Sequence, residues 1–143
     1  MLQRHRPLLR RTPLRWRRQR KAAPLSRRDP AAYAYLLAVH ALPCYACLLE
    51  GVVTFGVHAH HSKTRPDGSS YGSGHATDYE TIPLCEAHHA NYGVAGRAFH
   101  AATTAWRARY GSELDAVAWT QACIKAGTWR QPSWAFSPLP GSL

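Results

Sequence analysis

The chain has 143 residues, enough for one domain, and a formal net charge of +10 at pH 7. We identify no apolar run near the roughly twenty residues that cross a bilayer, and no apolar stretch of a secretory signal follows the basic N-terminus, so membrane and secreted proteins are both disfavoured. In the cytoplasmic protein that we therefore expect, the four cysteines favour metal binding over a disulfide framework.

The positive charge is concentrated in residues 1–28, which contain eleven Lys and Arg and no acidic residue. Residues 29–143 carry seven Lys or Arg against eight Asp or Glu, a net charge of −1. With few apolar groups to bury, this arm is predicted to be disordered. Because such a density of like charge is unfavourable without a polyanion, we predict that the arm contacts DNA or RNA, and DNA first. The predicted contacts, by phosphate pairing and base stacking, are Arg10, Arg11, Arg15, Trp16, Arg17, Arg18, Arg20 and Lys21. The alternative is a solvated tail without a specific partner.

Asp29 and Pro30 predict the start of a helix, with Asp as the N-cap and Pro at the first helical position. The helix is expected to end near Pro43. The side chains available for its buried face are Leu36, Leu37 and Tyr33.

A C-x-x-C pair follows, Cys44 and Cys47, and this pair alone fits either a redox site or a zinc site. Further along the chain, Cys85 and His88 form a C-x-x-H pair. The βαβ context of a thioredoxin-like protein is absent, so the second pair favours zinc. We predict a tetrahedral structural zinc held by Cys44, Cys47, Cys85 and His88.

The segment VVTFGVHAHH, residues 52–61, predicts a strand because it is rich in β-branched and aromatic residues. Alternation places Val53, Phe55 and Val57 on one face of this strand, and His58 and His60 on the other. The polar residues 62–76, with three glycines, predict a flexible loop.

A second short strand is expected over residues 78–82, and Pro83 fits the start of a helix that carries the next histidines. His88 and His89 would be about 100° apart on this helix, so one can face the zinc while the other faces the first strand. The geometry of one helix therefore predicts two metal sites on its two sides.

Two further helices are predicted towards the C-terminus. Residues 97–110 carry an apolar stripe of Phe99, Ala102 and Trp106. Ser112, followed by Glu113 and Asp115, opens another helix. The side chains expected to pack from that helix are Val117, Trp119, Cys123 and Ile124, with Cys123 a buried free thiol. Residues 128–143, with three prolines, predict a flexible tail.

The ordered series CxxC, AHH, a Gly-rich loop, a Thr-Asp step and IPLCxxHH, over residues 44–89, resembles the HNH (ββα-metal) nucleases. Within this family it looks more like the RecA-dependent nucleases of phages and related phage HNH proteins, whose basic N-terminal segments the RRTPLR phrase also resembles. The resemblance implies a β-hairpin and a helix that together clasp one divalent cation, Mg²⁺ or Mn²⁺. A RecA-type recombinase filament is a candidate partner on the same ground.

Carried over by position, the resemblance makes His60 and His89 ligands of the catalytic cation and His61 the general base, with Asp78 near the position of the middle Asn of the motif. An imidazole can deprotonate water near neutral pH, and the cation can stabilise the scissile phosphate and the leaving 3′ oxygen.

The chain departs from the family pattern at two positions. His75 stands where relatives often have Lys, and Gly93 stands where they often have a further His, so the ligand set is short by one. The residues that can complete it are His75, His100 and Asp78.

We therefore expect an α+β fold in which residues 29–127 form a zinc-stabilised ββα-metal core with flanking helices. The expected function is metal-dependent DNA cleavage in phage or prophage recombination or repair. One alternative is a non-catalytic, zinc-stabilised DNA-binding module. Another is a histidine cluster that serves only to bind zinc.

Overall fold

The structure is a computed structural model that describes residues 29–74, 76–90 and 96–132. Within these ranges the chain forms a small mixed α+β fold with a two-stranded antiparallel sheet. Its elements are α1 (Pro30–His40), α2 (Tyr45–Leu49), β1 (His58–His61), β2 (Thr81–Leu84), α3 (Glu86–His89), α4 (Thr103–Tyr110) and α5 (Glu113–Ala126). The predicted basic arm, residues 1–28, lies outside the described residues, as do His75 and Gly93.

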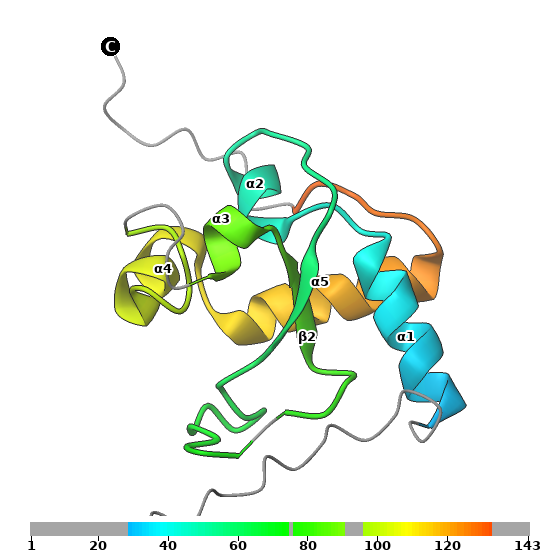
Figure 1. Ribbon diagram of the computed structural model, residues 1–143, viewed down its shortest axis with the longest axis horizontal. Helices are drawn as coiled ribbons and strands as arrows, with labels where there is room; N and C mark the ends of the chain where they lie inside the picture. The colour runs from blue at the N-terminus through cyan, green and yellow to red at the C-terminus, as the bar shows by residue number, and fades with distance from the viewer. Residues whose placement is uncertain (1–28, 75, 91–95, 133–143) are drawn as a thin grey trace, which may run out of the picture.

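The two strands form a hairpin in front of the longest helix, α5 (Figure 1). Helix α1 lies to one side of this hairpin, and α3 and α4 lie to the other (Figure 1). Short α3 follows β2 after a single residue, so the chain runs strand, strand, helix through the segment that holds most of the histidines. This arrangement brings residues from both halves of the chain to one side of the hairpin.

The strand β1 is shorter than predicted, because it begins only at His58. Its pairing with β2 runs from His58 opposite Leu84 to His61 opposite Thr81. Residues 52–57 have no strand partner, and Val53 and Phe55 are more than half exposed, at 52% and 56%. Val57, which the prediction placed on the same face, is buried but also precedes the strand, because a β-rich composition alone does not supply the second strand that pairing requires.

The second strand and the next helix also begin later than predicted. The strand covers Thr81–Leu84 rather than residues 78–82, and Pro83 lies inside it, opposite Ala59, instead of opening a helix. Proline has no N–H to donate, and it is tolerated here because both strands of a two-stranded sheet are edge strands. The helix α3 begins at Glu86.

The helix α1 begins as predicted, with the side chain of Asp29 accepting a hydrogen bond from the N–H of Ala31 at 3.2 Å. Its buried face differs from the prediction, since Leu36 is buried but Leu37 and Tyr33 are exposed. Helical periodicity explains this difference, because residues 33 and 37 lie four apart and share a face that turns outward. The side chains that the helix buries are Ala32, Leu36 and Val39.

The stretch Pro30–Leu49 is long and apolar enough to cross a membrane by length and composition, contrary to the expectation from the sequence. Of its most apolar window, 56% is buried inside the fold, and the stretch is divided into α1 and α2. Both features fit the core helices of a folded domain equally well.

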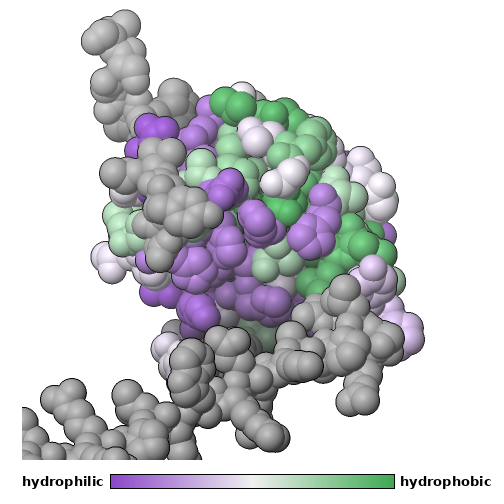
Figure 2. All heavy atoms as spheres, viewed as in Figure 1, coloured by the Kyte–Doolittle hydropathy of each residue, from purple (hydrophilic) through white to green (hydrophobic). Residues whose placement is uncertain are grey.

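The exposed apolar side chains of α1 and of residues 52–55 lie along one margin of the surface, while hydrophilic side chains gather over the middle (Figure 2).

The core between the hairpin and the C-terminal helices is built on Trp106, which is fully buried. Its ring lies 5.3 Å from the ring centroids of both Phe99 and Tyr110. The sequence identified Phe99 and Trp106 correctly, although α4 begins only at Thr103. The helix α5 is capped by Ser112, as predicted, and buries Cys123 as a free thiol.

The first residues of the predicted tail contact the body of the fold. Trp129 packs against the core, and the side chain of Gln131 donates a hydrogen bond to the carbonyl of Leu48 at 2.9 Å. The described structure therefore continues to residue 132, beyond the predicted boundary at 127, and residues 133–143 lie outside it.

Replacing Trp106 by Ala is expected to destabilise the fold by about 3–5 kcal/mol, because it removes a buried aromatic ring and leaves a cavity. The free energy of unfolding in urea, measured with zinc present, checks this expectation. Thr104→Ala, at an exposed position of the same helix, serves as the control and should change it by less than about 0.5 kcal/mol. Equal stabilities of the two variants would contradict the central place of Trp106 in the core.

Candidate metal sites

The four predicted zinc ligands come together in the structure from two separate helix starts. Cys44 and Cys47 lie at the beginning of α2, and Cys85 and His88 lie at the beginning of α3. All four side chains are buried, and one donor atom from each lies within 4.8 Å of the others. The predicted Cys₃His group is therefore confirmed as a cluster that can hold a structural metal ion.

The spacing of the donor atoms fits a tetrahedral zinc ion. With bonds of about 2.3 Å to sulfur and 2.0–2.1 Å to nitrogen, a tetrahedron separates two sulfurs by about 3.8 Å and a sulfur from a nitrogen by about 3.6 Å. The Sγ atoms of Cys47 and Cys85 lie 3.8 Å apart. Nδ1 of His88 lies 3.2, 3.4 and 3.7 Å from the Sγ atoms of Cys85, Cys47 and Cys44.

The burial of this cluster has an electrostatic consequence. Burial raises the pKa of the thiols of Cys44 and Cys47, because a thiolate loses hydration inside the fold. Burial likewise lowers the pKa of His88, which favours a neutral imidazole. A zinc ion would offset the cost of the buried thiolates, and it binds neutral imidazole directly.

Glu50 supports the cluster from the side opposite the thiols. Its Oε2 lies 3.5 Å from Nε2 of His88, so the ring presents Nδ1 to the three sulfurs. Burial by itself would raise the pKa of Glu50, but a hydrogen bond from the Tyr110 hydroxyl at 2.6 Å and the nearby charges lower it. Arg97 and Arg109 supply two of these charges, at 3.5 and 3.4 Å from Oε1 of Glu50.

A second group that can hold a metal ion consists of His60, His89 and His100, again with one nitrogen from each within 4.8 Å of the others. The ring centroids are 4.8–5.2 Å apart. Nε2 of His89 lies 3.2 Å from Nε2 of His100. Two nitrogens bound to one ion at 2.0–2.1 Å are separated by about 3.0–3.4 Å, so this pair fits a shared ion.

The imidazoles of this second group are held neutral. Burial, reinforced by the neighbouring His60, His100 and His58, lowers the pKa of His89 to about 4. Burial also lowers the pKa of His60, although the carboxylate of Glu113 acts in the opposite direction. Neutral imidazoles are the protonation state that metal binding requires.

The helix α3 separates the two groups as predicted. His88 points to the thiols and His89 points to β1, where the ring of His58 stacks on it at 5.6 Å. Successive residues of a helix differ in direction by about 100°, so adjacent histidines reach different sides of the same short helix.

His61 makes a different contact from its neighbour in β1. Its Nε2 lies 2.9 Å from Oδ1 of Asp78, and the two side chains are 33% and 27% exposed. The structure thus joins two residues that the sequence singled out, 17 positions apart. It places them as a pair of their own, in which His61 follows His60 directly in β1.

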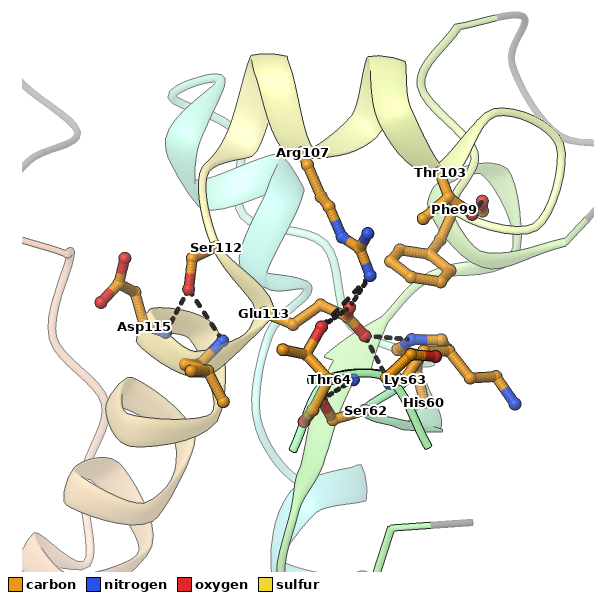
Figure 3. A network of polar contacts seen from close by, with 12 residues as sticks. His60, Ser62, Lys63, Thr64, Phe99, Thr103, Arg107, Ser112, Glu113 and Asp115 are labelled. Atoms are coloured by element: carbon orange, nitrogen blue, oxygen red, sulfur yellow. Dashed lines mark hydrogen bonds and ion pairs between the residues drawn. The ribbon is translucent and has the colours of Figure 1, made fainter. Parts of the chain in front are cut away.

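Glu113 is a buried carboxylate at the start of α5 that reaches the second group (Figure 3). Its Oε1 lies 3.4 Å from Nε2 of His60 and accepts a hydrogen bond from the N–H of Lys63 at 2.7 Å. Its Oε2 accepts hydrogen bonds from Arg107 at 2.6 Å and Thr64 at 2.8 Å. Burial opposes ionisation, but these donors lower the pKa of Glu113 to about 2.

Sequence reasoning missed the role of two acidic residues, Glu50 and Glu113. It placed Glu113 only at the start of a helix, and no local pattern connects either residue to a histidine. His100 was one of the candidates for the missing ligand, and the structure brings it to His60 and His89. Among the other two candidates, Asp78 pairs with His61, and His75 lies outside the described residues.

The fold and its sites define a small α+β protein with a candidate zinc centre and a second candidate metal site built from three histidines. A scan against protein-family models and a search of curated proteins found no match to this chain.

Proposed function

We propose that the chain is a metal-dependent DNA endonuclease of the HNH type, built on a ββα-metal core that a structural zinc ion stabilises. The observation that carries the proposal is the group of His60, His89 and His100, together with the pair of His61 and Asp78, of which His61 follows His60 directly in β1. A role in phage or prophage recombination, with a RecA-type filament as partner, rests on the resemblance of residues 44–89 alone.

The proposed general base is His61. Because Asp78 lies next to Nε2, the proton of the neutral ring sits on Nε2, and Nδ1 has a free lone pair. Nδ1 would take the proton of a water molecule as that water attacks phosphorus, and Asp78 would stabilise the imidazolium that forms. In this role Asp78 orients the base and keeps its own charge.

His60, His89 and His100 would hold the catalytic cation. When bound, this ion would supply Lewis-acid stabilisation of the scissile phosphate and of the leaving 3′ oxygen. Three imidazoles leave coordination positions open for phosphate oxygen and water. The proposal requires that the scissile phosphate lie between these three rings and His61.

The donor set also predicts which cation acts. Nitrogen donors favour transition-metal ions, whereas Mg²⁺ prefers oxygen ligands. In a plasmid-nicking assay we expect faster cleavage with Mn²⁺ than with Mg²⁺, and none with EDTA. His100→Ala should abolish the Mn²⁺-stimulated part. Cleavage that survives this substitution would remove His100 from the site, and DNA binding without any cleavage would favour the non-catalytic zinc module.

The basic arm, residues 1–28, is proposed as the main electrostatic contact with DNA. Deleting it should weaken DNA binding and make the affinity less dependent on salt. The slope of log K against log[salt] should become less negative by about 0.7–0.9 for each phosphate that the arm neutralises. Binding measured between low and physiological salt checks this result. Deletion of residues 133–143, which contain no Lys, Arg, Asp or Glu, is the control. An unchanged slope in the arm deletion would refute the role.

A further inference from the structure

Glu113 is buried in a way that its place in the helix does not explain. An acidic residue in the first turn of a helix is favourable when exposed, and Asp115 of the same turn is exposed. The side chain of Glu113 is instead fully buried, with a relative exposure of 0%. Burying a carboxylate is unfavourable unless several donors compensate for the lost water, so this residue has a role beyond starting the helix.

The two oxygens of Glu113 serve different partners (Figure 3). Oε2 is held by Arg107 and by the hydroxyl of Thr64. Oε1 accepts from the backbone N–H of Lys63 and faces Nε2 of His60 at 3.4 Å. The contacts of Oε2 fix the position of the carboxylate. The contacts of Oε1 fix the end of β1, which carries the proposed metal ligand His60.

The contact with His60 selects one tautomer of its ring. An ionised carboxylate only accepts hydrogen bonds, so the nitrogen that faces it carries the proton. That nitrogen is Nε2, which leaves the lone pair of Nδ1 for a metal ion. Carboxylates that accept a hydrogen bond from a metal-bound histidine fix its orientation and increase its basicity.

The ring of His60 is confined on its other sides as well. It packs against the ring of Phe99 at a centroid distance of 4.2 Å, and Phe99 in turn contacts Trp106. Aromatic packing restricts the tilt of the imidazole but does not distinguish its two nitrogens. The hydrogen-bond partner makes that distinction.

We propose that Glu113 is the positioning residue of the three-histidine site, which holds His60 in the tautomer that presents Nδ1 to the catalytic cation. It rests on the proposed function, which identifies the three-histidine site as the site of the catalytic cation. It concerns metal binding, so it can be tested without DNA.

The test uses the full-length, zinc-loaded chain and Mn²⁺ as the probe. Glu113→Gln should weaken Mn²⁺ binding by about 10–100-fold, since an amide keeps the size of the side chain but loses its charge and can turn its NH₂ towards His60. The control variant, Asp115→Asn at an exposed position of the same helix turn, should bind Mn²⁺ almost as the unaltered chain does. Equal affinity in Glu113→Gln and this control would overturn the proposal.

A second measurement needs no variant. The ¹⁵N NMR shifts of the His60 ring in the zinc-loaded chain, without added Mn²⁺, should show the proton on Nε2. A proton on Nδ1 would contradict the assignment even if the variants failed to fold. If Mn²⁺ binds with the expected dependence on Glu113 and no DNA is cut, the proposed function fails while the positioning role stands.

Discussion

Replacing Cys85 by Ser, or removing zinc with a strong chelator, is expected to unfold the described domain. Cys85 joins the start of α3 to Cys47 in α2, and no disulfide links these segments in the described part of the chain. Zinc binding contributes about 10–16 kcal/mol in small zinc domains, whereas a whole domain is stable by only about 5–15 kcal/mol. Loss of one thiolate should therefore remove most of the stability.

Thermal unfolding followed by circular dichroism, together with the zinc content of the purified protein, measures this effect. The matched control is Cys123→Ser, because Cys123 is also a buried free thiol but lies in α5, apart from the cluster. This control should keep a stoichiometric zinc ion. A Cys85→Ser variant with the same unfolding temperature and zinc content as the control would show that the four residues do not form a structural zinc site.

The substitution His61→Ala is expected to cause a large loss of the proposed nuclease activity. Removing a general base reduces the rate by about 10²–10⁴-fold, and the contacts that we propose between the arm and DNA do not involve this side chain. Cleavage in Mn²⁺ should therefore fall while DNA retention in a gel stays nearly constant. Asp78→Asn should lower the rate as well, because it weakens the orientation of the imidazole through the 2.9 Å contact.

His40→Ala is the control, since His40 is an exposed histidine of α1 and belongs neither to the three-imidazole group nor to the pair with Asp78. The cleavage rate of this variant should change only slightly. If His61→Ala and His40→Ala cleave at the same rate, His61 is not the base. If neither the unaltered chain nor any variant cleaves DNA, the zinc-stabilised binding module becomes the better description.

The sequence by itself determined the features that depend on local spacing. The C-x-x-C and C-x-x-H pairs each span one helical turn, so they bring two ligands together wherever the rest of the chain goes. The divergence of His88 and His89 follows from helix geometry, and the caps at Asp29 and Ser112 follow from hydrogen bonding within a few residues. These predictions needed no tertiary contact.

Only the tertiary structure decided which distant residues complete the second site. His100 and Glu113 follow β1 by about 40 or more positions in the chain, and they reach His60 because the C-terminal part of the chain folds back against the hairpin, with α4 to one side of it and α5 behind it (Figure 1). The length of β1 was also decided by its partner, since a strand extends only as far as another strand pairs with it. Packing between separate segments leaves no periodic trace in a single sequence. This is why the four residues of the candidate zinc site could be predicted while Glu113, which positions His60 in our proposal, could not.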